Sequence, residues 1–212
     1  MIEAVLFDLD GTLIDTVQDL AASANFALSH FSLPPHTIDT YKSFIGNGVP
    51  TLLKRASGYE IGTTNHGKML KIFRDYYSVH CCDKSLPYGE IHEVLSELKK
   101  RNIKTAVVTN KLHEMAVRMI ENFFPDMFDM VVGSGDLPPK PDTTMVKYII
   151  KQLCLTPESC LLVGDSGVDM TVAKNCDFTA VGVLWGYRQK GELLEKGADF
   201  LIENPQKIMN FI

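Results

Sequence analysis

Short apolar runs and helical stripes alternate along most of the chain. The first run, Ala4–Phe7, ends in acidic residues and Gly11, which is typical of a buried parallel strand that leads into a polar loop. Runs at 104–108, 128–132, 160–163, 178–183 and 199–202 predict further strands. Apolar residues at helical spacing over 91–98, 112–123 and 146–153 predict helices between them. The alternation predicts an α/β fold, a Rossmann-like, doubly wound parallel sheet with helices on both faces.

One interval contains no strand-like run. Between about Asp15 and Lys84 the apolar residues follow helical spacing, over 17–28, 38–44, 50–56 and 68–80. Turn or hinge residues lie at both borders of this interval. We therefore expect a first core segment at 1–14, a helical cap at 15–84 inserted after the first strand, and a second core segment at 85–212.

Composition and charge narrow the class of protein. The 212 residues are 45% hydrophobic and 22% charged, and the formal net charge is −5, as in ordinary soluble proteins. Nucleic-acid-binding proteins usually carry a basic surface, and no apolar run is long enough for a bilayer, so neither partner is expected. The five cysteines lack zinc-ligand spacing, which favours reduced thiols. No signal peptide is expected, because the first motif begins within ten residues of Met1. We expect a cytoplasmic monomer or weak homodimer.

Polar residues suited to chemistry follow several predicted strands. Asp8 and Asp10 follow the first strand, Thr109 the second, and Asp165 and Asp169 the fourth. Lys140 lies between the latter two groups, in a proline-rich segment. Because the carboxyl ends of parallel strands meet at one edge of the sheet, these side chains are expected to converge.

Such a cluster fits phosphoryl transfer. Clustered carboxylates repel one another unless a cation neutralises them, and oxygen ligands favour a hard ion such as Mg²⁺. Thr109 and Lys140 offer a neutral donor and a cation to phosphoryl oxygens. Taken singly, Asp8, Asp165 or Thr109 could be an ordinary strand-end or helix-cap residue, and Lys140 a solvated loop charge. The ordered combination favours the catalytic interpretation.

Six segments carry a family resemblance. They are Asp8–Thr16, Ile45–Val49, Val108–Lys111, Lys140–Pro141, Gly164–Asp169 and Trp185–Arg188. With these segments the chain resembles the haloacid dehalogenase superfamily, and within it the phosphoglycolate phosphatase-like branch, over almost its whole length.

The resemblance implies the catalytic roles. Asp8 would be the nucleophile that carries an aspartyl phosphate. Asp10 would protonate the leaving alkoxide and then deprotonate the water that hydrolyses the intermediate. Thr109 and Lys140 would hold the transferring oxygens.

The resemblance also implies the binding residues. The phosphoryl group would be bound by Leu9, Gly11, Thr109, Asn110 and Lys140. Mg²⁺ would be held by Asp8, the backbone carbonyl of Asp10 and Asp165, while Asp169 and Ser166 would orient metal-bound waters or Lys140. The cap would close over a small phosphorylated metabolite and exclude water.

Other chemistries of the family are disfavoured by particular residues. Dehalogenases lack an acid two residues after the nucleophile, whereas Asp10 is present here. Phosphonate-cleaving relatives need a cap lysine and phosphomutases a cap arginine, and the stretch 44–49 contains neither. These features favour a monophosphate, with 2-phosphoglycolate as the first expectation. Phosphoglycolate phosphatases commonly have a second proline two residues after Pro141, whereas Thr143 stands here.

Within the cap, Gly46, Asn47 and Gly48 could form either a tight turn that needs positive φ or a substrate loop, and both can hold at once. Arg55 is expected to meet a substrate carboxylate, although it could also be an ordinary surface charge.

Three alternatives stay open. A pyrophosphatase or a sugar-phosphate phosphatase or phosphomutase could use the same fold. A phospho-acceptor signalling module would be phosphorylated on a strand-end Asp without turnover. A catalytically inactive binding protein would require a lesion in the set of acids, and none is seen.

Overall fold

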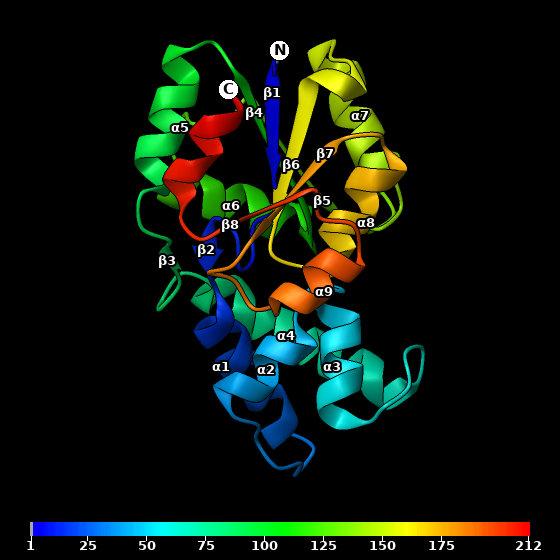
Figure 1. Cartoon of the computed structure of the whole chain (residues 1–212). Helices are drawn as coiled ribbons and strands as arrows, with labels where there is room; N and C mark the ends of the chain where they lie inside the picture. Colours follow the sequence, from blue (N-terminus) through cyan, green and yellow to red (C-terminus); the bar gives the residue numbers. More distant parts are fainter. Residues whose placement is uncertain (1) are drawn as a thin grey trace.

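The computed structural model describes residues 2–212. Its main sheet has six parallel strands in the order β5-β4-β1-β6-β7-β8 (Figure 1). The inner strand β1 (Ala4–Phe7) pairs with β4 (Lys104–Leu112) on one side and β6 (Cys160–Gly164) on the other. The remaining strands are β5 (Met130–Ser134), β7 (Thr179–Val183) and β8 (Phe200–Ile202). The predicted parallel α/β sheet is confirmed.

Helices cover both faces of this sheet. Val5 and Phe7 of β1 belong to one buried cluster, which includes residues of α5 (Ile91–Lys100) and α6 (His113–Phe123). Ala4 and Leu6 belong to the opposite cluster, with residues of α7 (Thr144–Leu153) and α8 (Gly167–Asn175). Because successive strand residues point to opposite faces and both faces are buried, β1 is apolar throughout.

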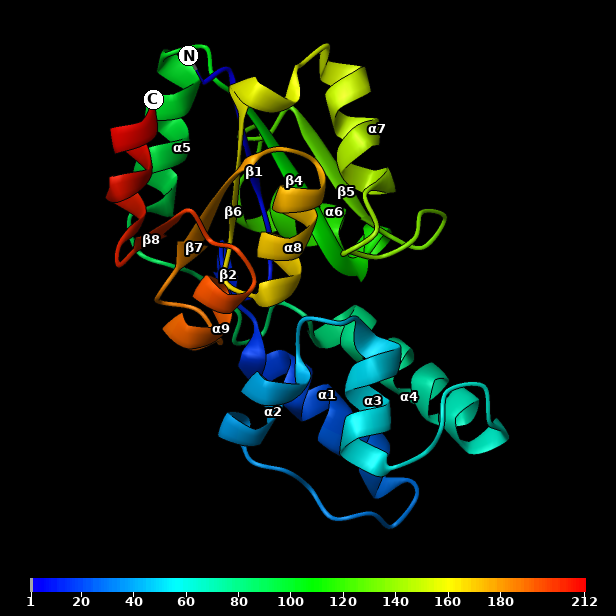
Figure 2. The ribbon, with the colours of Figure 1, turned by 45° about the vertical axis from the view of Figure 1, so that its right-hand side comes forward.

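The cap consists of α1 (Val17–Ser29), α2 (Ile38–Phe44), α3 (Val49–Ser57) and α4 (Thr64–His80). Figures 1 and 2 show these helices gathered at the carboxyl end of β1, opposite the chain termini. The division at 1–14, 15–84 and 85–212 accords with this element order and remains our proposal. No helix within residues 2–212 has the length and apolar character needed to cross a membrane.

The two linkers of the cap lie side by side. β2 (Ile14–Asp15) pairs antiparallel with β3 (Leu86–Pro87). Beside this ribbon, the buried carboxylate of Asp19 accepts hydrogen bonds from the backbone N–H groups of Lys84 and Ser85 and from the Ser85 hydroxyl. The start of α1 is thereby held to the segment that returns to the core.

Several elements differ from the sequence expectation. β4 continues past residue 108 to Leu112, with a register shift after Thr109. α4 begins at Thr64, earlier than expected, because the Thr63 hydroxyl caps its first turn. α8 was not predicted as a helix, and a reciprocal capping box between Ser166 and Asp169 marks its start. The short elements η1 (Pro157–Ser159), α9 (Lys190–Glu195) and η2 (Pro205–Phe211) complete the chain.

Candidate active site

The nucleophile candidate lies where β1 ends. The Asp8 N–H donates to the carbonyl of Val163 in β6 at 2.9 Å, so the sheet ladder still fixes its backbone. The chain then turns tightly, and the carbonyl of Leu9 accepts the N–H groups of Leu13 and Ile14. Gly11 adopts φ +90°, and a Cβ atom there would lie 2.4 Å from Asp165 Oδ2. Glycine is therefore required both for the turn and for the approach of Asp165.

Lys140 joins the acids into one buried group. Its ammonium donates to Asp8 Oδ1 at 2.8 Å, Asp169 Oδ1 at 2.6 Å and the carbonyl of Val108 at 2.7 Å. Burial alone would lower the pKa of Lys140, but the charges of Asp169 and Asp8 outweigh burial and raise it. The amine therefore stays charged, with all three of its N–H groups committed.

Asp169 and Asn110 fix this lysine from two sides. Asp169 Oδ2 accepts from the N–H and hydroxyl of Ser166 while Oδ1 accepts from Lys140. The side-chain oxygen of Asn110 accepts the N–H of Lys140 at 2.6 Å, and its amide group donates to the carbonyls of Lys140 and Gly46. Asn110 thus positions Lys140 and also contacts the cap loop.

The acids form a group that fits a divalent cation. Carboxylate oxygens of Asp8, Asp165 and Asp169 lie within 4.8 Å of one another, and all three residues are buried. Burial, only partly offset by Lys140, raises the pKa of Asp8 to about 7. Burial and the charges of Asp8 and Asp169 also hold the pKa of Asp165 well above its usual range. A set of oxygen ligands whose negative charge Lys140 only partly offsets suits Mg²⁺.

Asp10 belongs to a second polar group, which reaches into the cap. Its Oδ1 accepts from the Thr16 hydroxyl at 2.7 Å and from the ammonium of Lys111 at 2.8 Å. Lys111 also donates to the phenol oxygen of Tyr77 in α4 at 2.7 Å. Asp10 thus accepts hydrogen bonds from two donors, and one of them, Lys111, also contacts the cap.

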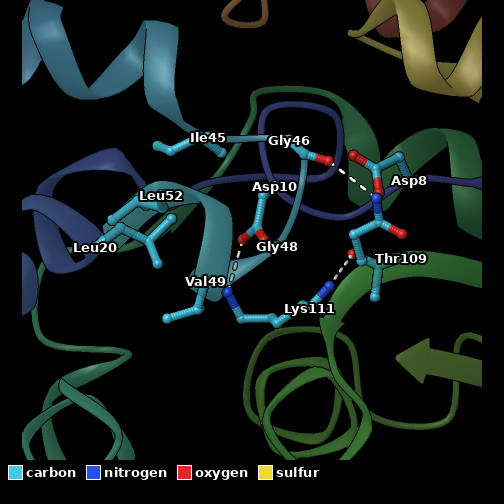
Figure 3. Close-up of a pocket in the computed structure, with 11 residues that line it drawn as sticks. Asp8, Asp10, Leu20, Ile45, Gly46, Gly48, Val49, Leu52, Thr109 and Lys111 are labelled. Atoms are coloured by element: carbon cyan, nitrogen blue, oxygen red, sulfur yellow. Dashed lines mark hydrogen bonds and ion pairs between the residues drawn. The ribbon is translucent and has the colours of Figure 1, made fainter. Parts of the chain in front are cut away.

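A small cavity of about 40 Å³ lies between these groups (Figure 3). Its polar lining includes Asp8, Asp10, Thr109, Asn110 and Lys111, and its apolar wall is formed by Leu20, Ile45, Val49 and Leu52. The Thr109 hydroxyl oxygen accepts the N–H of Lys111 at 3.2 Å, which leaves the hydroxyl hydrogen available to a ligand. Space of this size holds only a few waters, so the site suits a small substrate.

The comparisons with known proteins agree with this geometry. Residues 5–183 match the haloacid dehalogenase-like hydrolase family. The chain belongs to that family. It is 32% identical to the phosphoglycolate phosphatase of Mannheimia succiniciproducens, covering 97% of this chain and 96% of that protein. It is also 32% identical to the phosphoglycolate phosphatase of Chromobacterium violaceum, with 96% and 93% covered.

The fold comparison extends over the same length. A solved structure from Haemophilus somnus, described as a predicted phosphoglycolate phosphatase, superposes with a TM-score of 0.91 at 29% identity and covers 99% of this chain and 97% of that one. The expected membership of the haloacid dehalogenase superfamily and the expected phosphatase class are therefore confirmed.

In this haloacid dehalogenase-like hydrolase the predicted cap residues divide into two pairs. Gly46 and Gly48 line the cavity with φ values of +109° and +79°, so the tight-turn interpretation holds while the loop also faces the site. Arg55 instead donates to the carbonyl of Phe44 and to Asn47 Oδ1. Arg55 and Asn47 brace the loop and are absent from the cavity lining within residues 2–212.

The predicted phosphate loop has one unexpected detail. The N–H of Gly11 donates to the carbonyl of Ile14 at 2.9 Å, and the side chain of Leu9 is buried in the core. Gly11 therefore contributes space and a turn in this structure, and its N–H is already paired.

Several contacts at the site were not foreseen. Tyr77 lies within the predicted helix at 68–80, and helical spacing alone gives no sign of the partner of its hydroxyl. Lys111 directly follows Thr109 and Asn110 at the strand end, which is the one local signal that could have identified it. Tyr187 belongs to a segment that carries the family resemblance, and its N–H donates to Asp165 Oδ2 at 2.7 Å while its hydroxyl contacts Asp15 and Thr16.

Proposed function

We propose that this phosphatase is Mg²⁺-dependent and hydrolyses 2-phosphoglycolate through an aspartyl phosphate on Asp8. The observation that carries the proposal is the convergence of Asp8, Asp165 and Asp169 with Lys140 at the carboxyl ends of β1 and β6. The names of the relatives and the small size of the cavity support the substrate. A cytoplasmic location remains part of the proposal.

Asp8, the backbone carbonyl of Asp10 and Asp165 would hold the metal ion. Asp169 has both oxygens engaged by Lys140 and Ser166 and is better suited to orienting that lysine. When bound, Mg²⁺ supplies positive charge that favours the ionised form of Asp8 and offsets the charge of the phosphoryl group.

In the first step a carboxylate oxygen of Asp8 bonds to phosphorus and the bond from phosphorus to the ester oxygen breaks. Asp10 gives its proton to the departing glycolate oxygen. Lys140 and the Thr109 hydroxyl stabilise the charge on the transferring oxygens.

In the second step water attacks phosphorus, and Asp10 takes the water's proton. The bond from phosphorus to Asp8 then breaks, which releases inorganic phosphate and restores the carboxylate. The hydrogen bonds from Thr16 and Lys111 hold the Asp10 carboxyl in place through both steps.

Phosphate release from 2-phosphoglycolate, pyrophosphate and hexose phosphates, with Mg²⁺ or with EDTA, tests the proposal. We expect Mg²⁺-dependent release with the highest kcat/KM for 2-phosphoglycolate, and none from Asp8→Asn. The exposed Asp177→Asn variant is the control and should keep wild-type rates. A preference for pyrophosphate or a sugar phosphate would reject the substrate, and one stoichiometric phosphorylation without turnover would indicate a phospho-acceptor module.

A further inference from the structure

Lys111 is a buried cation that the steps above use only to hold Asp10. Its side chain is 3% exposed, and its ammonium donates to Asp10 Oδ1 and to the Tyr77 hydroxyl. The same ammonium lies 4.9 Å from the centroid of the Tyr77 ring. Burying an ammonium is costly unless it is paired. An ammonium has three N–H groups, and these contacts use two of them.

The other cations near the cavity are already committed. Lys140 uses its three N–H groups on Asp8, Asp169 and the carbonyl of Val108. The guanidinium of Arg188 is directed at backbone carbonyls of residues 42–45 at the end of α2, and Arg55 at Phe44 and Asn47. Among the described residues that line the cavity, Lys111 is the only cation.

The position of the Lys111 ammonium beside Asp10 determines which part of a bound substrate it can reach. Figure 3 shows its amine beside Asp10 and Val49. If Asp10 protonates the ester oxygen of the substrate, a cation 2.8 Å from the Asp10 carboxylate can reach a group one carbon beyond that oxygen. In 2-phosphoglycolate a single methylene separates the ester oxygen from the carboxylate. The apolar wall offers no other charged partner for that carboxylate.

We propose that Lys111 binds the carboxylate of the substrate and thereby selects phosphorylated short hydroxy acids over phosphate esters that lack a carboxylate. The inference rests on the proposed function, because Asp10 must face the leaving oxygen. Tyr77 of α4 accepts a hydrogen bond from the ammonium, so carboxylate recognition depends on a cap residue as well as a core residue.

The test compares 2-phosphoglycolate with ethyl phosphate, which has a methyl group in place of the carboxylate. In Lys111→Met we expect kcat/KM to fall about 100-fold or more for 2-phosphoglycolate and less than about tenfold for ethyl phosphate, because a charged hydrogen bond is lost only with the former. A merely structural lysine that acts through Asp10 would lower both rates by the same factor, since Asp10 serves either leaving group.

Binding provides a readout that is independent of turnover. In the Asp8→Asn background, Lys111→Met should raise the Kd for 2-phosphoglycolate and leave the Kd for ethyl phosphate nearly unchanged. Lys174→Met, which removes a surface lysine paired with Asp199, is the matched control and should leave both Kd values unchanged. Lys111→Gln allows the same comparison if Lys111→Met fails to fold.

The outcomes separate the two proposals. A wild-type enzyme that prefers 2-phosphoglycolate, with the same preference retained in the Lys111 variants, overturns the role of Lys111 alone. A wild-type enzyme that hydrolyses 2-phosphoglycolate no better than ethyl phosphate overturns the proposed substrate. The proposed carboxylate site is then rejected as well.

Discussion

Lys140 Nζ lies 2.8 Å from Asp8 Oδ1, although the two residues are 132 positions apart in the chain. The pair is almost completely buried, and Lys140 also neutralises Asp169. Removing one partner of a buried ion pair leaves an uncompensated charge.

Lys140→Met should therefore destabilise the metal-free protein by about 3–5 kcal/mol and lower kcat by about 100-fold or more. Urea unfolding in EDTA and steady-state kinetics measure the two effects. The control is Lys174→Met, which breaks a surface pair with Asp199 and should cost at most about 1 kcal/mol without affecting kcat. Equal destabilisation by both variants would contradict the importance of burial.

The pH dependence of stability follows from Asp8. Burial raises its pKa to about 7, so the metal-free folded protein holds this proton more tightly than the unfolded chain does. The stabilising contribution is complete below the unfolded value of 3.8 and is lost as the pH rises through about 7. In EDTA, the stability of Asp8→Asn relative to wild type should increase between pH 4 and pH 7 and then level off.

Asp199 provides a control of opposite sign. Burial raises its pKa, but hydrogen bonds from Lys174 and the Ala180 N–H outweigh burial and lower it. The ionised Asp199 carboxylate stabilises the folded protein above its unfolded pKa, and this stabilisation is lost as the pH falls. The decrease in the free energy of unfolding caused by Asp199→Asn should therefore be smallest at acid pH. A pH-independent difference for Asp8→Asn would show that Asp8 titrates normally.

Metal binding should depend on Asp165. Because Tyr187 N–H occupies only Oδ2 of this buried carboxylate, the other oxygen is available to an ion. We expect Mg²⁺ to raise the Tm of the wild-type protein and EDTA to reverse the rise, as binding to the folded state requires. Asp165→Asn should shift the midpoint of this Mg²⁺ titration at least tenfold, whereas Asp177→Asn should not. An unchanged midpoint in Asp165→Asn would exclude it as a ligand.

Two glycines have nearly equal φ values but different surroundings. Substituting each by alanine distinguishes the effect of backbone strain from the effect of a steric clash. Gly11 has φ +90° and no room for a Cβ beside Asp165, whereas Gly62 has φ +91° and nothing within 4 Å. Gly62→Ala should cost about 1–2 kcal/mol of stability and no activity. Gly11→Ala should also lower kcat/KM by about 100-fold, because it displaces a proposed metal ligand. Similar activity in both variants would mean that Asp165 can move without consequence.

Much of the fold could be predicted because its signals are local. The run Ala4–Phe7 is apolar throughout because its residues face two buried cores in turn. Asp8 and Asp165 stand at strand ends, and the parallel sheet brings such ends to one edge whatever lies between them. The acidic group therefore followed from the strand pattern and the order of the motifs.

Contacts between the cap and the core could not be predicted in the same way. The Lys111 ammonium meets Tyr77 only because α4 is oriented with that hydroxyl toward β4. A helical stripe indicates which residues are buried but not which polar group they meet. Arg55 shows the converse, since its charge suggested a substrate contact, whereas its guanidinium donates to the carbonyl of Phe44 at the end of α2.

The position of β1 within the sheet also has a consequence for folding. Ala4 pairs with Lys104 on one side and with Cys160 on the other. On the ribosome the strand that bears the nucleophile emerges first, and both of its neighbours are synthesised after the four cap helices. Such non-local pairing slows folding. A nascent chain interrupted before β6 would expose an apolar strand edge and lack the acids that complete the site.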